Sequence, residues 1–162
     1  MKKIILLLFI PFVLTSCSVK SCTPIIEPSF NYDVKYIMGD FCFNCNVTKN
    51  NDTVTVFVKD TNASGLQIIY DGQNLELKKN ELSYKISSEN IERTNPAIIF
   101  SDIFNYIVNN VDTCVKKAEN GYVYTGNICI GQFNVYQNFD NEIYLITVPD
   151  ANIKIELTKI YD

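Results

Sequence analysis

The side chains best suited to chemistry in this chain are six cysteines, which occur without a single histidine. The cysteines are Cys17, Cys22, Cys42, Cys45, Cys114 and Cys129. The absence of histidine removes the Ser-His-Asp and Cys-His arrangements of nucleophilic catalysis, the commonest general base and the commonest zinc ligand. The composition therefore argues against an enzyme.

Cys42 and Cys45 form a Cys-x-x-Cys motif, the spacing of a redox pair or of half a zinc site. A redox motif of this kind opens a helix, whose dipole lowers the thiol pKa. Here residues 36–47 alternate in the manner of a strand, on which residues three apart point to opposite faces. We therefore expect the two sulfurs to diverge, which disfavours redox activity. A zinc site that adds Cys114 and Cys129 is disfavoured because the sulfurs of Cys42 and Cys45 are expected to diverge and because the chain lacks a second Cys-x-x-Cys motif.

Acidic pairs are the other candidates for catalysis. Glu89 with Glu92, and Asp140 with Glu142, have the close spacing of paired carboxylates. Both pairs fall in predicted loops or turns, where solvated acids usually lie. The polar cluster at 50–52 lacks the spacing of a calcium loop. The sequence therefore predicts no catalytic residue, no metal site and no cofactor.

The first 17 residues, MKKIILLLFIPFVLTSC, have the layout of an export signal. Two lysines precede an apolar run that is shorter than the roughly 20 residues of a permanent membrane span. Leu14-Thr15-Ser16-Cys17 resembles the lipobox of bacterial lipoproteins. The resemblance implies that residues 1–16 are a lipoprotein signal peptide and that Cys17 is lipidated, which would anchor the protein on the extracytoplasmic face of the cell membrane. The alternative is a buried N-terminal helix or an uncleaved anchor.

The chain that follows the signal is acidic. The signal carries two of the 14 basic residues and none of the 18 acidic ones, so the mature chain has 12 against 18, a net charge of −6. This balance argues against nucleic acid as a partner and against electrostatic docking on anionic lipid. Lipidation of Cys17 leaves an odd number of cysteines. Cys114–Cys129 is a candidate disulfide, and buried free thiols are the alternative.

Residues 17–33 contain prolines and no periodicity, which indicates a tether before a single domain at 34–162. Alternating apolar residues predict strands at 36–47, 54–58, 66–70, 75–77, 121–125, 128–139, 143–148 and 153–157, with 82–86 as a further short candidate. Asp71-Gly72 predicts a two-residue hairpin turn that pairs Ile68 with Leu75. Short connections between the strands indicate an antiparallel sheet.

One mature segment reads clearly as a helix. Asn95 can serve as the N-cap and Pro96 suits the first helical position. The following sequence, AIIFSDIFNYIVNNV, repeats its apolar residues at helical spacing. Strands, one helix and further strands together predict an α+β fold, in which an antiparallel sheet packs one main helix on one face.

This layout is similar to that of the lipoprotein-carrier, or LolA-like, superfamily. The similarity is carried by the early hairpin, the Gly65-Leu66 step, the helix that begins at Asn95-Pro96 and the closing meander, and it covers 36–160. It implies a curved antiparallel half-barrel with the helix on its concave side.

Two functions fit this architecture. The first is a non-enzymatic, membrane-anchored lipoprotein that binds an apolar ligand or lipid inside the half-barrel. Its candidate lining residues are Phe41, Phe43, Ile68, Leu75, Phe100, Phe104 and Phe133. The alternative is an envelope protein-interaction or structural module, in which the same residues form a filled core without a ligand. A cavity would support the first function, whereas a large exposed apolar patch away from the tether would favour the second.

Overall fold

The structure is a computed structural model that describes residues 26–161. The predicted signal peptide at 1–16, Cys17 and Cys22 lie outside the described residues. The described part begins about midway along the predicted tether, at Ile26.

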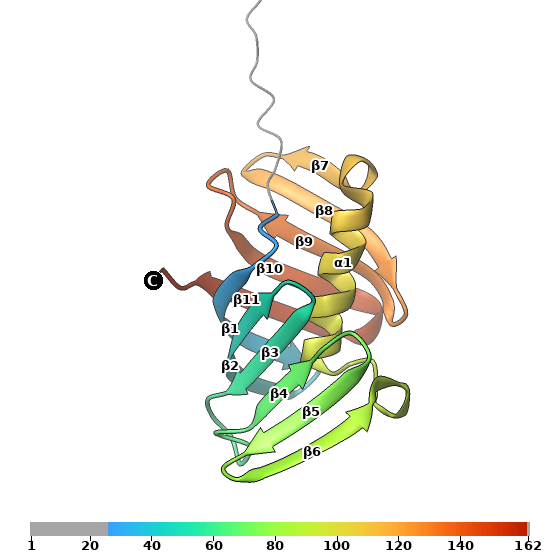
Figure 1. The fold of residues 1–162 in the computed structure, drawn as a ribbon. Helices are drawn as coiled ribbons and strands as arrows, with labels where there is room; N and C mark the ends of the chain where they lie inside the picture. The colour runs from blue at the N-terminus through green and yellow to red at the C-terminus, as the bar shows by residue number, and fades with distance from the viewer. Residues whose placement is uncertain (1–25, 162) are drawn as a thin grey trace, which may run out of the picture.

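In this part of the chain, eleven strands form one antiparallel sheet in the order β6-β5-β4-β3-β2-β1-β11-β10-β9-β8-β7 (Figure 1). The strands are β1 (Phe30–Met38), β2 (Phe41–Asn50), β3 (Thr53–Val58), β4 (Gln67–Tyr70), β5 (Asn74–Lys79), β6 (Leu82–Ser87), β7 (Val115–Ala118), β8 (Gly121–Ile128), β9 (Gly131–Gln137), β10 (Ile143–Val148) and β11 (Ile153–Lys159). Two short 3-10 turns, η1 (Ser88–Asn90) and η2 (Pro149–Ala151), accompany the single α-helix of the described residues, α1 (Pro96–Cys114).

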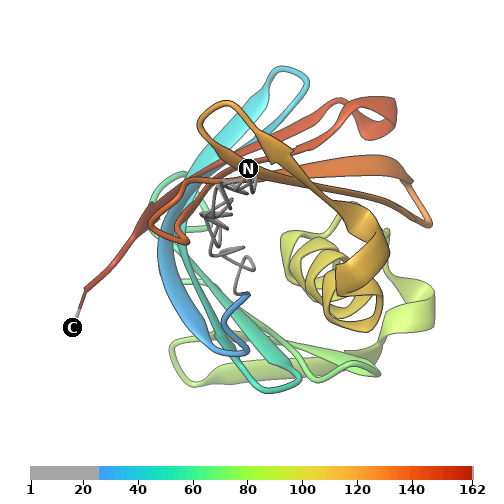
Figure 2. The same cartoon turned by 90° about the horizontal axis from the view of Figure 1, so that it is seen from above.

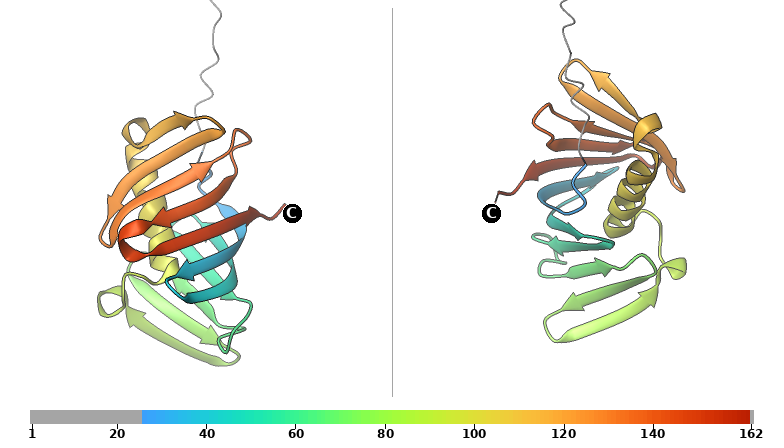
Figure 3. Two further views of the ribbon diagram at one scale, coloured as in Figure 1. Left: turned by 180° about the vertical axis from the view of Figure 1, so that it is seen from behind. Right: turned by 45° about the horizontal axis from the view of Figure 1, so that its top comes forward.

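The first and last strands meet in the middle of the sheet. β1 pairs with β2 on one side and with β11 on the other, with Tyr36 opposite both Phe43 and Ile155. The two edge strands, β6 and β7, are joined through α1, which lies across the concave face (Figure 2). Seen from behind, the strands wrap around the helix without closing (Figure 3). The predicted fold class, a curved antiparallel half-barrel with one main helix, is confirmed.

The helix begins where the sequence predicts. The Asn95 side chain accepts a hydrogen bond from the backbone N of Ala97 at 3.0 Å, and Pro96 occupies the first helical position. This arrangement satisfies one of the backbone N–H groups that the first turn leaves without a partner. The helix buries one face, which includes Ile99, Phe100 and Ile103, against the sheet.

Replacing the cap should cost stability. We expect Asn95→Ala to lower the free energy of unfolding by about 1 kcal/mol, because the cap bond is lost at a partly buried helix start. The matched control is Asn109→Ala at an exposed position within the same helix, where alanine should be neutral or slightly stabilising. Urea unfolding followed by circular dichroism measures both variants, and a loss of equal size in the two would contradict the capping role.

The space between helix and sheet is filled with aromatic and branched side chains. The ring centroid of Phe30 lies 6.2 Å from that of Phe100 and 4.6 Å from that of Phe104. On the other half of the sheet, Tyr106 meets Phe133 edge-on at 5.3 Å. These residues belong to one continuous core that contains inward-facing side chains from both halves of the sheet.

The register predicted for the hairpin at Asp71-Gly72 is wrong. Ile68 lies opposite Leu77, and Tyr70 lies opposite Leu75, so the connection is longer than two residues. The Asp71 carboxylate accepts hydrogen bonds from the backbone N of Gln73 at 2.9 Å and of Asn74 at 2.6 Å, which stabilises a wider turn. The predicted and observed registers differ by two residues, and side chains alternate with period two along a strand. The same residues therefore form the apolar face of the hairpin in both registers.

The single strand predicted over 36–47 is also wrong, since it is two strands joined by a turn. Gly39 takes a φ of +57°, in the left-handed region that glycine enters without strain, and the chain reverses between Met38 and Phe41. The first strand begins at Phe30, ahead of the predicted domain boundary at 34. The predicted strand at 128–139 is divided in the same way by a turn before Gly131.

Candidate functional site

An open apolar groove lies at the end of the half-barrel where β1 turns into β2. We call it the end groove, and its volume is about 410 Å³. One wall comes from the β1–β2 hairpin and the other from the segment that leads into α1. The lining residues are Tyr36, Met38, Phe41, Phe43, Asn90, Ile91, Glu92, Thr94, Asn95 and Pro96.

The hairpin wall carries a pair of phenylalanines. Phe41 and Phe43 are two residues apart on β2, so both point toward the groove, and their ring centroids are 5.6 Å apart. Phe43 is 7% exposed and packs against Tyr36 at 5.3 Å, whereas Phe41 is 54% exposed. The groove therefore has a fixed aromatic floor and an aromatic side chain open to solvent at its mouth.

The opposite wall is held in place by a hydrogen bond across the groove. The Tyr36 hydroxyl donates to the carbonyl oxygen of Thr94 at 2.7 Å. Burial raises the pKa of Tyr36, so its hydroxyl keeps its proton and remains a donor at neutral pH. Because Asn95 also caps α1, the segment beside the groove is fixed both to the helix and to β1.

Of the seven predicted lining residues, Phe41 and Phe43 line the end groove. The other five are at most 7% exposed and pack in the core; they are Ile68, Leu75, Phe100, Phe104 and Phe133. Phe104 borders a gap of about 10 Å³, which is close to the minimum for one water molecule. The structure thus divides the predicted lining between a packed interior and an open groove at one end.

No other groove residue is predicted from the sequence to line a ligand site: Glu92 is predicted as a solvated loop acid, and Asn95 and Pro96 as the start of the helix. Ile91 lies in the polar stretch after β6, where no periodicity marks it, and Met38 lies beside the turn inside the range over which the alternation predicts one continuous strand. Only the tertiary fold brings them beside Phe43, so no local signal could have selected them.

The described cysteines are unbonded thiols. Cys42 is exposed and Cys45 is 1% exposed, which confirms that the motif diverges across the strand. Burial raises the pKa of Cys45 to about 12, which makes it a poor nucleophile at neutral pH.

The structure does not bring Cys114 and Cys129 together. Val115 lies opposite Tyr124, and Cys129 follows about 16 Å farther along the hairpin, well beyond the reach of a disulfide. Among residues 26–161, no three histidine, cysteine or acidic side chains gather as metal ligands would.

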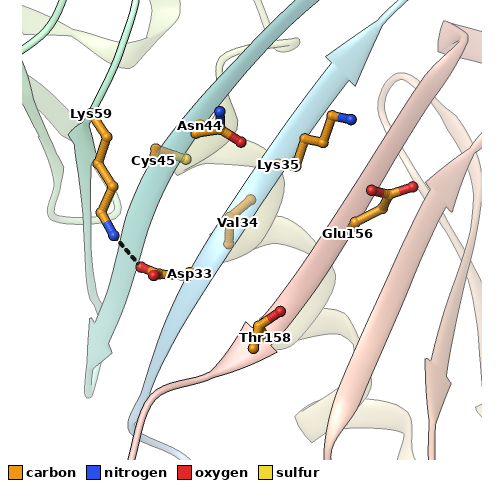
Figure 4. A pocket seen from close by; sticks show the side chains of 8 residues that line it. All are labelled: Asp33, Val34, Lys35, Asn44, Cys45, Lys59, Glu156 and Thr158. Carbon is orange, nitrogen blue, oxygen red and sulfur yellow. Dashed lines mark hydrogen bonds and ion pairs between the residues drawn. The ribbon is translucent and has the colours of Figure 1, made fainter.

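A second depression, of about 290 Å³, lies over the middle of the sheet on β1, β2 and β11 (Figure 4). Lys59 pairs with Asp33 here, and both side chains are more than 40% exposed. Lys35 and Glu156 lie farther along the neighbouring strands β1 and β11. Charges of both signs are spread over this solvated surface, and exposed ion pairs of this kind contribute little free energy. The depression is therefore a weaker candidate for a ligand site than the end groove.

The comparisons with known proteins concern the N-terminus and the fold. Residues 1–18 match the family model of the prokaryotic membrane lipoprotein lipid attachment site. The structure is similar to the crystal structure of a LolA superfamily protein from Nitrosomonas europaea, with a TM-score of 0.40 and 11% sequence identity over 86% of this chain and 89% of that chain. No curated protein matches the sequence.

The matched N-terminal range contains one cysteine, Cys17. No helix within residues 26–161 is both long and apolar enough to cross a membrane. The attachment site makes the chain a prokaryotic lipoprotein, held at the extracytoplasmic face of the membrane by a lipidated cysteine.

Proposed function

We propose that this lipoprotein, anchored through Cys17, is a non-enzymatic binding protein that takes an apolar chain, such as the acyl chain of a lipid, in the end groove. The observation that carries the proposal is the exposed Phe41 above the buried Phe43 in a groove of about 410 Å³. That volume falls within the range of small-molecule sites, about 300–1,000 Å³, which are apolar with a few polar groups at their edge.

The polar side chains of the groove favour binding over catalysis. Asn90, Glu92 and Thr94 lie along one wall and can orient a polar head group. Glu92 is the sole carboxylate among the described lining residues, and the raised pKa of Tyr36 keeps its hydroxyl neutral. A hydrolytic site needs a nucleophile, a base and an oxyanion donor together, whereas this groove offers an apolar floor beside a polar rim.

The alternative is an envelope interaction module, and the outer edge of the sheet favours it. Leu82 and Tyr84 on β6 are 78% and 63% exposed. β6 pairs on one side only, with β5, so its outer backbone groups are available to a strand of another protein. This surface lies away from the tether, as the interaction function requires.

The first test compares two exposed phenylalanines. We expect Phe41→Ser to weaken binding of a fluorescent long-chain fatty acid about 10- to 100-fold, because a large side chain loses its contact with the ligand. Phe57→Ser is the matched control, since Phe57 is 44% exposed on β3 and does not line the groove. Equal affinities for the two variants, or no binding by the unmodified protein, would leave the interaction module as the function.

The anchor is tested on the same preparation. Intact mass of the protein extracted from membranes should show acyl chains on Cys17, and lipid extraction of the folded protein should recover any ligand held in the groove. An unacylated product would refute the anchor without bearing on the groove.

A further inference from the structure

The end of the half-barrel opposite the end groove is where the chain joins the domain. We call it the tether end; it comprises Ile26–Phe30, the β7–β8 and β9–β10 turns, and residues 159–161. Ile26 and Asn141 line one small gap together with Phe104. β1 starts at the tether end and finishes at the end groove, so the two features lie at opposite ends of the same strand. The first described residues thus lie beside the β9–β10 turn, through Ile26 and Asn141, and beside the end of β11, through Glu27 and Lys159.

Two lysines fix the root of the tether to the sheet. The Lys49 ammonium, on a side chain only 6% exposed, donates to the carbonyl oxygens of Pro28 (3.3 Å) and Asn51. The Lys159 ammonium contacts both carboxylate oxygens of Glu27, at 3.1 and 3.2 Å. The chain therefore leaves the domain at a defined place.

Exposed aromatic residues flank this root on both sides. Phe139, in the β9–β10 turn, is 52% exposed, and the Lys117 ammonium lies 5.8 Å from its ring centroid. Tyr161, just after β11, is 72% exposed, and the Lys159 ammonium lies 5.9 Å from its ring. Aromatic side chains next to lysines are typical of the membrane–water interface, where rings sit at headgroup level and ammonium groups reach the lipid phosphates.

The length of chain outside the structure keeps these rings near the bilayer. Nine residue steps lead from Cys17 to Ile26, and even fully extended they reach about 32 Å. The tether end therefore stays within that distance of the lipid headgroups, whereas the end groove lies about 30 Å farther along β1.

We propose that the tether end rests on the lipid bilayer, with Phe139 and Tyr161 at headgroup level, and that the end groove consequently faces away from the membrane. The inference depends on the proposed anchor at Cys17. Glu119, Asp140 and Glu142 lie at the same end, so the contact comes from the aromatic rings and their paired lysines, not from net positive charge.

The chain contains no tryptophan, so a single introduced indole reports on its own position without background. The lipidated full-length variants Phe139→Trp and Tyr161→Trp are reconstituted into phosphatidylcholine vesicles with and without bromine on the acyl chains. We expect a blue-shifted emission and about a twofold loss of fluorescence in brominated vesicles, as for rings at headgroup level. Phe57→Trp and Tyr84→Trp are the controls, because both positions are exposed and lie outside the end groove and the tether end, and their emission should not change.

The outcomes separate the two proposals. If the protein fails to float with the vesicles, the anchor is refuted and the orientation falls with it. If it floats but the indoles at 139 and 161 are quenched no more than those at 57 and 84, the anchor stands and the orientation is overturned. Urea midpoints close to that of the unmodified protein establish that each variant is folded.

Discussion

Gly121→Ala is expected to lower the free energy of unfolding by about 3–5 kcal/mol, the sum of backbone strain and a steric clash. Gly121 has a φ of +150°, and a Cβ there would lie 1.9 Å from the carbonyl oxygen of Gln137. The obstacle is backbone, which cannot rotate away as a side chain could. It is also held in place, because Asn138 N donates to Glu142 O at 2.9 Å in the adjoining turn.

Gly65→Ala is the matched control for this variant. Gly65 also has a positive φ, +82°, but no atom lies within 4 Å of the position a Cβ would take. It should therefore lose only the cost of the left-handed backbone, about 1–2 kcal/mol. Urea unfolding of both variants separates strain from clash, and a loss at position 121 no larger than at position 65 would contradict the close approach of β8 to the end of β9.

Phe100→Ala is expected to cost about 3–5 kcal/mol, because the deleted ring leaves a void that the surrounding side chains fill only in part. Phe100 is fully buried, with its ring stacked on Phe104 at 6.2 Å and tilted against Phe30. The matched control is Phe57→Ala at 44% exposure, which should change stability by no more than about 0.5 kcal/mol.

The same variant tests whether the half-barrel is filled. A cavity lined by apolar side chains binds small apolar molecules such as benzene. We expect benzene to raise the thermal midpoint of Phe100→Ala and to leave that of the unmodified protein unchanged. A rise in the unmodified protein that persists in Phe41→Ser would show that the interior already holds ligand-sized space and would move the binding site from the end groove to the core.

The elements that could be predicted from the sequence are those fixed by near neighbours. Asn95 and Pro96 act within one helical turn, so the start of α1 followed from their types alone. The divergence of Cys42 and Cys45 followed from the alternation of a strand, which depends on backbone geometry and not on partners.

Turns were less predictable, because one residue pair supports several geometries. Asp71-Gly72 fits a two-residue hairpin, yet the Asp71 carboxylate binds two following backbone N–H groups and widens the loop. At Gly39 the apolar residues on both sides alternate as they would in one strand, so the pattern alone does not reveal that the chain reverses there.

The complete lining of the end groove could not be predicted, because it depends on contacts between segments that are far apart in the sequence. The alternation along β2 predicts that Phe41 and Phe43 share one face, and both line the groove. Ile91 and Pro96 join them only because the chain leaves one edge of the sheet and returns past the end of β1. The pairing of β1 with β11 likewise joins the two ends of the described chain, and no motif in either strand marks it.

The central position of β1 has a mechanical consequence for an anchored protein. Any pull between domain and membrane acts on the N-terminal end of β1, along the strand, and its hydrogen bonds to β2 and β11 resist the pull together in shear. The edge strands β6 and β7, each paired on one side only, lie outside this line of force. Fraying of either edge would leave the domain secured to its lipid, so the attachment should outlast local unfolding elsewhere in the sheet.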